Sequence, residues 1–222
     1  MFIHCTIVLQ TTRMTGRDLM ASQRALFTET EQRLSAGEPR GFRYQEQIIS
    51  EEAEASLAAE LRQLDLRPFE FRGYLGNRRV VNFGLKYDFS RRSVRRADDM
   101  PSFLDDLLKR AASFAGCEKD AFRQVGVNEY RAGAGIGWHK DKPEFGIIVG
   151  VSLLAPVTMR FRRPHNEEWI RISHTLKPRS IYILSGEARK DWEHSVPPPD
   201  ALRYSITFRT LAAEHAMSHR LG

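Results

Sequence analysis

The chain has 222 residues, of which 41% are hydrophobic and 10% aromatic, and this is enough to bury one sizeable core. Lysine and arginine total 34 against 28 acidic residues, and the net charge of +6 favours an anionic partner such as nucleic acid. Cys5 and Cys117 are too few for a disulfide framework, and no apolar run reaches membrane-spanning length. We therefore expect a soluble, cytoplasmic protein without a membrane partner.

Three helices are predicted in the first half of the chain. The apolar spacing of residues 17–35 predicts the first helix. The second follows Ser50, a favourable N-cap, and carries a stripe of leucines. The third runs from about residue 101 to residue 114 and ends before Gly116, a residue type that terminates helices.

Strands are predicted around and after the third helix. Residues 67–89 alternate aromatic and charged side chains, as a β-hairpin does, with its turn expected at Gly76 and Asn77. Beyond Gly116, short β-branched or alternating segments follow one another without helices, which favours an antiparallel sandwich or barrel. These segments are residues 122–130, 147–154, 157–163, 169–173, 180–186 and 203–210. The predicted class is α+β, with a double-stranded β-helix, or jelly-roll, core buttressed by the N-terminal helices.

The stretch "GWHKD" places His139 two positions before Asp141. If this segment leaves a strand, both side chains point to the same side and Lys140 points away. His194 is the best candidate for a third ligand, because it follows three further strands and the other histidines lie in polar or terminal contexts. Two histidines and one carboxylate form the facial arrangement of a non-haem iron(II) oxygenase, which leaves metal positions open.

The strand in "RYSITFR" has an unusually polar face, formed in part by Arg203, Ser205 and Arg209. Two guanidinium groups suit a dicarboxylate, because each can clamp one carboxylate with two hydrogen bonds. Asn128 and Tyr130 share one face of an earlier strand and provide amide and phenol donors for the same ligand.

Taken in order, four motifs resemble the AlkB family of iron(II)- and 2-oxoglutarate-dependent dioxygenases. They are Asn128-x-Tyr130, His139-x-Asp141, "SGEARKDWEH" ending in His194, and Arg203-x5-Arg209. The resemblance implies an enzyme that binds Fe(II) and consumes 2-oxoglutarate and O₂, with residues 41–222 as the oxygenase domain after an extension of residues 1–40.

Residue roles are also implied by the resemblance. The iron ligands would be His139, Asp141 and His194. The 2-oxoglutarate pocket would contain Asn128, Tyr130, Arg203, Ser205 and Arg209, with Ser205 in place of a family asparagine. Arg203 would take the remote carboxylate, and Arg209 would lie nearer the metal.

The substrate side departs from the pattern of the DNA-repair members. They carry an acidic residue two positions after the metal aspartate, where this chain has Pro143, so that contact is missing or comes from Glu144. Residues 78–89 look closer to the RNA-modifying branch of the family.

Residues 67–96 form the candidate substrate lid, in which aromatic side chains alternate with arginines. Aromatic faces stack on bases and arginines neutralise phosphates, whereas an ordinary hairpin would bury its aromatics in the core. A second basic patch is "RFRRPH", residues 160–165, which is otherwise a solvated strand end. The predicted substrate contacts are Tyr74, Arg78, Arg91, Arg92, Trp138 and Glu144.

The leading functional expectation is oxidative demethylation of N-alkylated bases in DNA or RNA by a monomeric enzyme, with loss of formaldehyde from an N-methyl group. The alternatives are hydroxylation or demethylation of a tRNA base or of a methylated protein side chain. Two further alternatives are not enzymes: a metal-binding jelly-roll module, and a protein whose basic surface simply binds nucleic acid.

Overall fold

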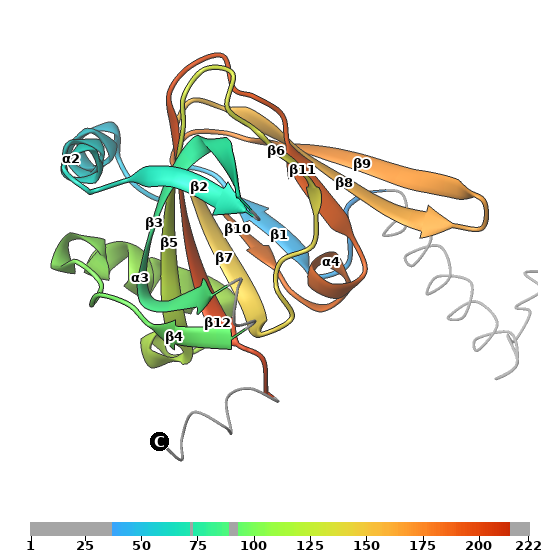
Figure 1. Cartoon of the computed structure of the whole chain (residues 1–222), viewed down its shortest axis with the longest axis horizontal. Helices are drawn as coiled ribbons and strands as arrows, with labels where there is room; N and C mark the ends of the chain where they lie inside the picture. The colour runs from blue at the N-terminus through green and yellow to red at the C-terminus, as the bar shows by residue number, and fades with distance from the viewer. Residues whose placement is uncertain (1–36, 72, 89–92, 214–222) are drawn as a thin grey trace, which may run out of the picture. The chain divides into compact units, whose positions relative to one another are not determined.

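The computed structural model describes residues 37–71, 73–88 and 93–213, and residues 39–213 belong to one compact unit (Figure 1). Two antiparallel sheets form its core, and the first has eight strands in the order β1-β10-β7-β12-β5-β3-β2 with β4 paired to β3. These strands are β1 (Phe42–Gln45), β2 (Arg67–Phe71), β3 (Tyr74–Asp88), β4 (Ser93–Arg96), β5 (Phe122–Tyr130), β7 (Phe145–Leu154), β10 (Ser180–Leu184) and β12 (Arg203–Leu211).

The second sheet has four strands in the order β6-β11-β8-β9. They are β6 (Ile136–His139), β8 (Val157–His165), β9 (Glu168–Leu176) and β11 (Glu193–Val196). All six segments predicted as strands after Gly116 are strands, and every pairing among the described strands is antiparallel. The jelly-roll prediction is therefore confirmed.

The helices among the described residues are α2 (Glu51–Arg62), α3 (Asp105–Ala115) and the short α4 (Gly186–Lys190), with 3-10 turns at Ser102–Leu104 and Lys119–Ala121. The Ser50 hydroxyl accepts a hydrogen bond from the backbone N–H of Ala53 at 3.2 Å, which caps α2 as predicted. Gly116 ends α3 at a φ of 70°, in the left-handed region that favours glycine. The helix predicted over residues 17–35 lies outside the described residues.

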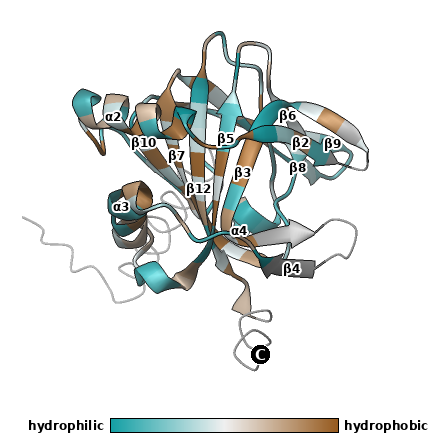
Figure 2. Cartoon of the chain, turned by 60° about the vertical axis from the view of Figure 1, so that its left-hand side comes forward, coloured by the Kyte–Doolittle hydropathy of each residue, from teal (hydrophilic) through white to brown (hydrophobic). Residues whose placement is uncertain are grey.

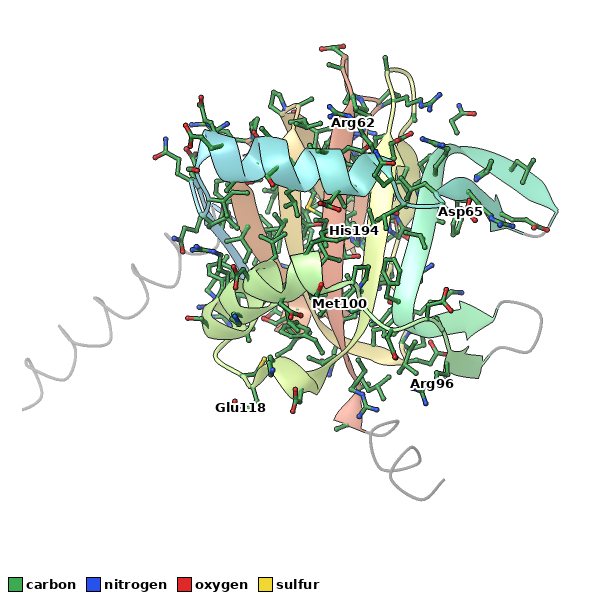
Figure 3. The ribbon with its side chains drawn as sticks, turned by 90° about the vertical axis from the view of Figure 1, so that its left-hand side faces the viewer. Arg62, Asp65, Arg96, Met100, Glu118 and His194 are labelled. Carbon is green, nitrogen blue, oxygen red and sulfur yellow. The ribbon has the colours of Figure 1, made fainter. Side chains whose placement is uncertain are left out.

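Two hydrophobic layers cover the two faces of the larger sheet. Helices α2 and α3 lie across one face (Figures 2 and 3), where Leu61 and Leu104 are fully buried beside Val127 and Ile206. The other face packs on the smaller sheet through a cluster that includes Phe161. Because strands such as β10 are buried on both faces, their sequences read as continuous apolar runs.

Strands β2 and β3 form the predicted hairpin, but its turn is not at Gly76 and Asn77. Phe71 pairs with Tyr74, so the two strands meet between these residues and β3 runs on through Gly76. Gly73 has a φ of +83°, which a tight turn requires and glycine adopts without steric cost. The position of the turn was predicted wrongly because two glycines compete three residues apart.

No helix in the described part of the chain is long and apolar enough to cross a membrane.

Glu129 is a buried anion that ties β5 to its neighbours. Its carboxylate accepts hydrogen bonds from Arg79 at 2.7 and 2.8 Å, from Arg131 at 3.0 Å and from the Tyr204 hydroxyl at 3.1 Å. Burial by itself would raise the pKa of Glu129, but these donors outweigh it and hold the pKa below its ordinary value.

We expect Glu129→Gln to lower the free energy of unfolding at neutral pH by about 2 kcal/mol, less than for a fully buried pair because the two arginines reach solvent. A lowered folded-state pKa stabilises the fold above the ordinary carboxyl pKa, and this contribution is lost as the pH falls through the folded-state value. The difference in the free energy of unfolding between the parent protein and Glu129→Gln should therefore shrink in acid. Urea unfolding from neutral to acidic pH measures it, with Glu60→Gln on the exposed side of α2 as the control. A difference independent of pH would contradict this account.

Candidate active site

Two neighbouring strands of the smaller sheet carry the predicted metal histidines. β6 ends at His139, β11 contains His194, and these residues are paired across the strands. Asp141 follows β6 by two residues. The ligand atoms of the three side chains lie within 4.8 Å of one another, and the imidazole centroids are 4.3 Å apart. The structure thus brings together three residues that are up to 55 positions apart in the sequence.

Hydrogen bonding orients the first imidazole. Nδ1 of His139 lies 2.9 Å from the carbonyl oxygen of Gly137. A carbonyl only accepts, so Nδ1 carries the proton and donates it, which leaves the lone pair of Nε2 for a metal.

Burial and neighbouring charges prepare the other two ligands. Burial, and after it His139, lower the pKa of His194 to about 3, so its imidazole is neutral at physiological pH. Burial alone would raise the pKa of Asp141, but His194 and Arg209 outweigh it and lower the pKa to about 2. Two imidazoles and one ionised carboxylate on one side of a cavity fit an Fe(II) ion that keeps open positions.

A cavity of about 480 Å³ extends from these residues between the two sheets. Arg203 lines it and is 1% exposed, and its Nε atom donates to the Ser152 hydroxyl at 3.0 Å. Its guanidinium carbon lies 5.1 Å from the centroid of the Tyr130 ring. Burial lowers the pKa of Arg203, and its Nη1 atom is buried without a hydrogen-bond partner. A buried cation with an unused donor is suited to one carboxylate of a dicarboxylate ligand.

Arg209 lies nearer the predicted metal ligands. Its Nη2 atom is 3.6 Å from Oδ1 of Asp141, and its Nη1 atom donates to the Gln124 side chain at 3.0 Å. Between the two arginines, Ser205 on β12 pairs with Asn128 on β5, and both line the cavity. Two adjacent strands therefore bring together the whole predicted 2-oxoglutarate set, Asn128, Tyr130, Arg203, Ser205 and Arg209.

Tyr182 is a cavity residue that the sequence reasoning missed. It is buried on β10 opposite Gly150 of β7, and burial raises the pKa of its phenol. A Cβ atom at residue 150 would collide with the Tyr182 ring, so the ring fits only because that position is glycine. A glycine inside an otherwise apolar strand was the available signal for such a close approach.

Arg189 was also missed, although it lies inside the "SGEARKDWEH" motif. It is 7% exposed on α4, and its Nη2 atom donates to the carbonyl oxygens of Lys142 and of Phe145, the latter at 2.8 Å. Its guanidinium therefore holds the chain that immediately follows Asp141.

The structure places the predicted substrate contacts unequally. Arg78 and Trp138 line the cavity, and the Arg78 guanidinium lies 3.9 Å from the centroid of the Phe69 ring, which also lines it. Tyr74 begins β3, and its side chain is not among those described. Arg91 and Arg92 lie outside the described residues.

Glu144 is not among the described residues that line the cavity. Its Oε2 atom is buried, and its backbone carbonyl accepts from the N–H of Ala212 at 2.9 Å. The short connection to β7 turns Glu144 towards the end of β12, so the structure gives no support to a base contact from this residue.

Residues 41–209 match the model of the 2OG-Fe(II) oxygenase superfamily, and the chain belongs to this superfamily of enzymes, which use Fe(II), 2-oxoglutarate and O₂. Relatives with AlkB-type names support the AlkB resemblance within that superfamily, and a solved structure with an AlkB-type title shares the fold. The AlkB resemblance and the expectation of an enzyme are confirmed, and the two non-enzymatic alternatives are set aside.

Two curated relatives have AlkB-type names. The chain is 32% identical over 147 residues to "Alkylated DNA repair protein ALKBH8 homolog" of Arabidopsis thaliana, covering 55% of this chain and 42% of that protein. It is 29% identical over 171 residues to "tRNA (carboxymethyluridine(34)-5-O)-methyltransferase ALKBH8" of Mus musculus, covering 72% of this chain and 24% of that protein. The chain thus matches less than half the length of either relative.

Solved structures share the fold at low sequence identity. The structure titled "The structure of OsALKBH1" has a TM-score of 0.57 at 16% identity and covers 78% of this chain and 97% of that chain. A Pseudomonas putida prolyl-4-hydroxylase has a TM-score of 0.55 at 13% identity, and the match covers 78% of this chain and 93% of that chain.

We expect Arg203→Lys to weaken 2-oxoglutarate binding roughly 10- to 100-fold, because a lysine keeps the charge but loses the paired donors. Calorimetric titration of 2-oxoglutarate into the anaerobic Mn(II)-loaded protein measures this change. Arg43→Lys is the matched control, because Arg43 also lies over an aromatic ring, that of Phe114 at 5.0 Å. If the affinities of Arg203→Lys and of the parent protein for 2-oxoglutarate agree within twofold, Arg203 is not a 2-oxoglutarate contact.

We expect Arg189→Met to weaken Fe(II) affinity by about 10-fold, because the carbonyls of Lys142 and Phe145 lose their donor and the Asp141 segment loosens. Competition with a chelator measures the affinity, and circular dichroism checks that the fold is kept. Arg43→Met serves as the control. If the Fe(II) affinity of Arg189→Met equals that of the parent protein, the hydrogen bonds from Arg189 to Lys142 and Phe145 do not position the metal site.

Proposed function

We propose that the chain is a dioxygenase that oxidises a modified base in RNA, with a tRNA base as the first candidate. The proposed iron ligands are His139, Asp141 and His194, and the proposed 2-oxoglutarate contacts are Asn128, Tyr130, Arg203, Ser205 and Arg209. The observation that carries the chemistry is the buried, unsatisfied Nη1 atom of Arg203 in the same cavity as the His–Asp–His cluster. Residues 41–222 form the proposed oxygenase domain, acting as a monomer.

Bound Fe(II) and 2-oxoglutarate supply the oxidising chemistry, and the protein supplies orientation and exclusion of water. Arg203 and Tyr130 hold the far end of the cosubstrate in a buried site. Arg209 lies beside Asp141, where it acts after His194 in lowering the pKa of that carboxyl. This order of charges points the reacting end of a dicarboxylate towards the metal ligands.

The open side of the cavity supports a base as substrate. Phe69 of β2, Arg78 of β3 and Trp138 of β6 all line it. Aromatic and guanidinium planes stack on bases, and guanidinium N–H groups donate to base carbonyls. These side chains are the proposed base contacts.

Two features favour RNA. The name of the mouse relative places that protein in tRNA uridine modification. Pro143 occupies the position where the DNA-repair members of the family carry an acidic residue. The name of the Arabidopsis relative refers instead to alkylated DNA repair, so N-demethylation of alkylated DNA is the second candidate function.

A turnover assay tests the proposal. The protein is loaded anaerobically with Fe(II), exposed to air and 2-oxoglutarate, and incubated with total tRNA or with N-methylated DNA oligonucleotides, single-stranded and duplex. Succinate, formaldehyde and digested nucleosides are then quantified, with His139→Ala as the control.

We expect succinate to rise with tRNA together with a nucleoside that has gained one oxygen atom or lost a methyl group. Coupled succinate and formaldehyde only with methylated DNA would replace the RNA proposal by the second candidate. Succinate no higher than in His139→Ala would contradict the assignment of the iron site.

A further inference from the structure

The outer face of the smaller sheet is polar and cationic, and apart from Trp138 at its edge the active-site assignment does not use it. Along β8, Met159 and Phe161 are buried against the larger sheet, so Arg160 and Arg162 point to the opposite face. The register places Arg171 of β9 beside Arg162. In Figure 1, β8 and β9 extend as a long hairpin next to β11 and β6.

Aromatic rings alternate with these arginines. The guanidinium carbon of Arg162 lies 4.5 Å from the ring centroid of Trp138 and 4.3 Å from that of Trp169. The guanidinium carbon of Arg160 lies 5.3 Å from the Trp138 ring. Trp169 is 38% exposed, and it is one of the two large hydrophobic side chains that stand out as exposed among the described residues. An exposed indole beside fixed guanidinium groups is a stacking platform for flat rings.

Two arginines on this face are held in place before any ligand binds. The Nε atom of Arg162 donates to Glu193 at 2.6 Å, and the Nε atom of Arg160 donates to the Ser195 hydroxyl at 3.1 Å. Both acceptors lie on β11, one residue to each side of the proposed iron ligand His194. Side chains that are already ordered lose less entropy on binding, so this arrangement favours association.

This face is continuous with the mouth of the active-site cavity. Trp138 belongs to β6, the edge strand of the smaller sheet, and it lines the cavity together with Lys140. The platform therefore begins at the cavity and leads outward over β11, β8 and β9. A polymer with one unit in the cavity would have its adjoining units above this surface.

We propose that the outer arginine face, defined as Trp138, Arg160, Arg162, Trp169 and Arg171, binds the unpaired RNA segment that flanks the substrate base. The inference rests on the proposed function and extends it from the base to the strand. Alternation of indoles and guanidinium groups matches the alternation of bases and phosphates in a single strand. The exposed hydroxyls of Thr158 and Ser173 lie on the same face, where they provide partners for 2′-hydroxyl groups.

The test measures binding separately from turnover. Fluorescence anisotropy follows a labelled single-stranded RNA of about twelve nucleotides, with DNA of the same sequence and duplex RNA as comparison ligands, at several salt concentrations. The variant is Arg160→Gln combined with Trp169→Ala, which spares Arg162 and its bond to Glu193. The matched control is Arg43→Gln, which removes an arginine stacked on an aromatic ring elsewhere on the fold.

We expect the double variant to bind single-stranded RNA about 10-fold more weakly than the parent protein, because one stacking partner and one phosphate contact are lost. Its affinity should also depend less steeply on salt concentration. Arg43→Gln should bind as the parent protein does. Affinity of the double variant within twofold of the parent would overturn the proposal. Preference of the parent protein for single-stranded DNA or for duplex RNA would overturn the assignment to an unpaired RNA segment.

The assay also separates the two levels of the inference. Weakened RNA binding by the double variant, in a protein that oxidises no tRNA base, would contradict the proposed function and support the surface. Oxidation of a tRNA base with an unchanged KM for tRNA in the double variant would support the proposed function and overturn the surface.

Discussion

The site depends on the pairing of β6 with β11. This pairing sets His139 opposite His194 and delivers both imidazoles, with Asp141 just beyond the end of β6, to one end of the cavity. In an antiparallel sheet, a slip of one residue would turn a side chain to the other face. The inner side would then lose a histidine, and the outer face would lose either Trp138 of β6 or the Glu193 and Ser195 acceptors of β11. One register therefore determines both the proposed iron site and the proposed RNA surface.

The cavity is electrostatically prepared for an anion. Arg203 is fully buried and Arg209 is largely buried. Among the described residues that line the cavity, the one acidic side chain is that of Asp141. Burying a guanidinium group costs free energy unless its donors are satisfied, and Arg203 has a donor left over. A dicarboxylate would offset that cost, which explains why such a polar strand face is compatible with the centre of the larger sheet.

The two faces of the smaller sheet serve different purposes. The inner face carries Phe161 and His194, which belong to the interior. The outer face carries charged side chains that pair with β11 and stack on indoles. The hairpin sequence "RFRRPH" was open to interpretation as a solvated strand end, and only the position of Trp138 beside it connects this basic patch to the cavity.

Much of this protein was determined by the sequence alone, because local patterns carry it. Strand alternation predicted the jelly-roll class, and Ser50 and Gly116 marked helix ends. Motif spacing selected the three proposed metal ligands and the two proposed cosubstrate arginines, which the structure brings to one cavity. The turn of the β2–β3 hairpin, the clamp made by Arg189 and the separation of Glu144 from the cavity were decided only by the tertiary structure. The physical reason is that each depends on which distant groups a side chain or turn meets: a carbonyl 44 residues away for Arg189, or the end of β12 for Glu144.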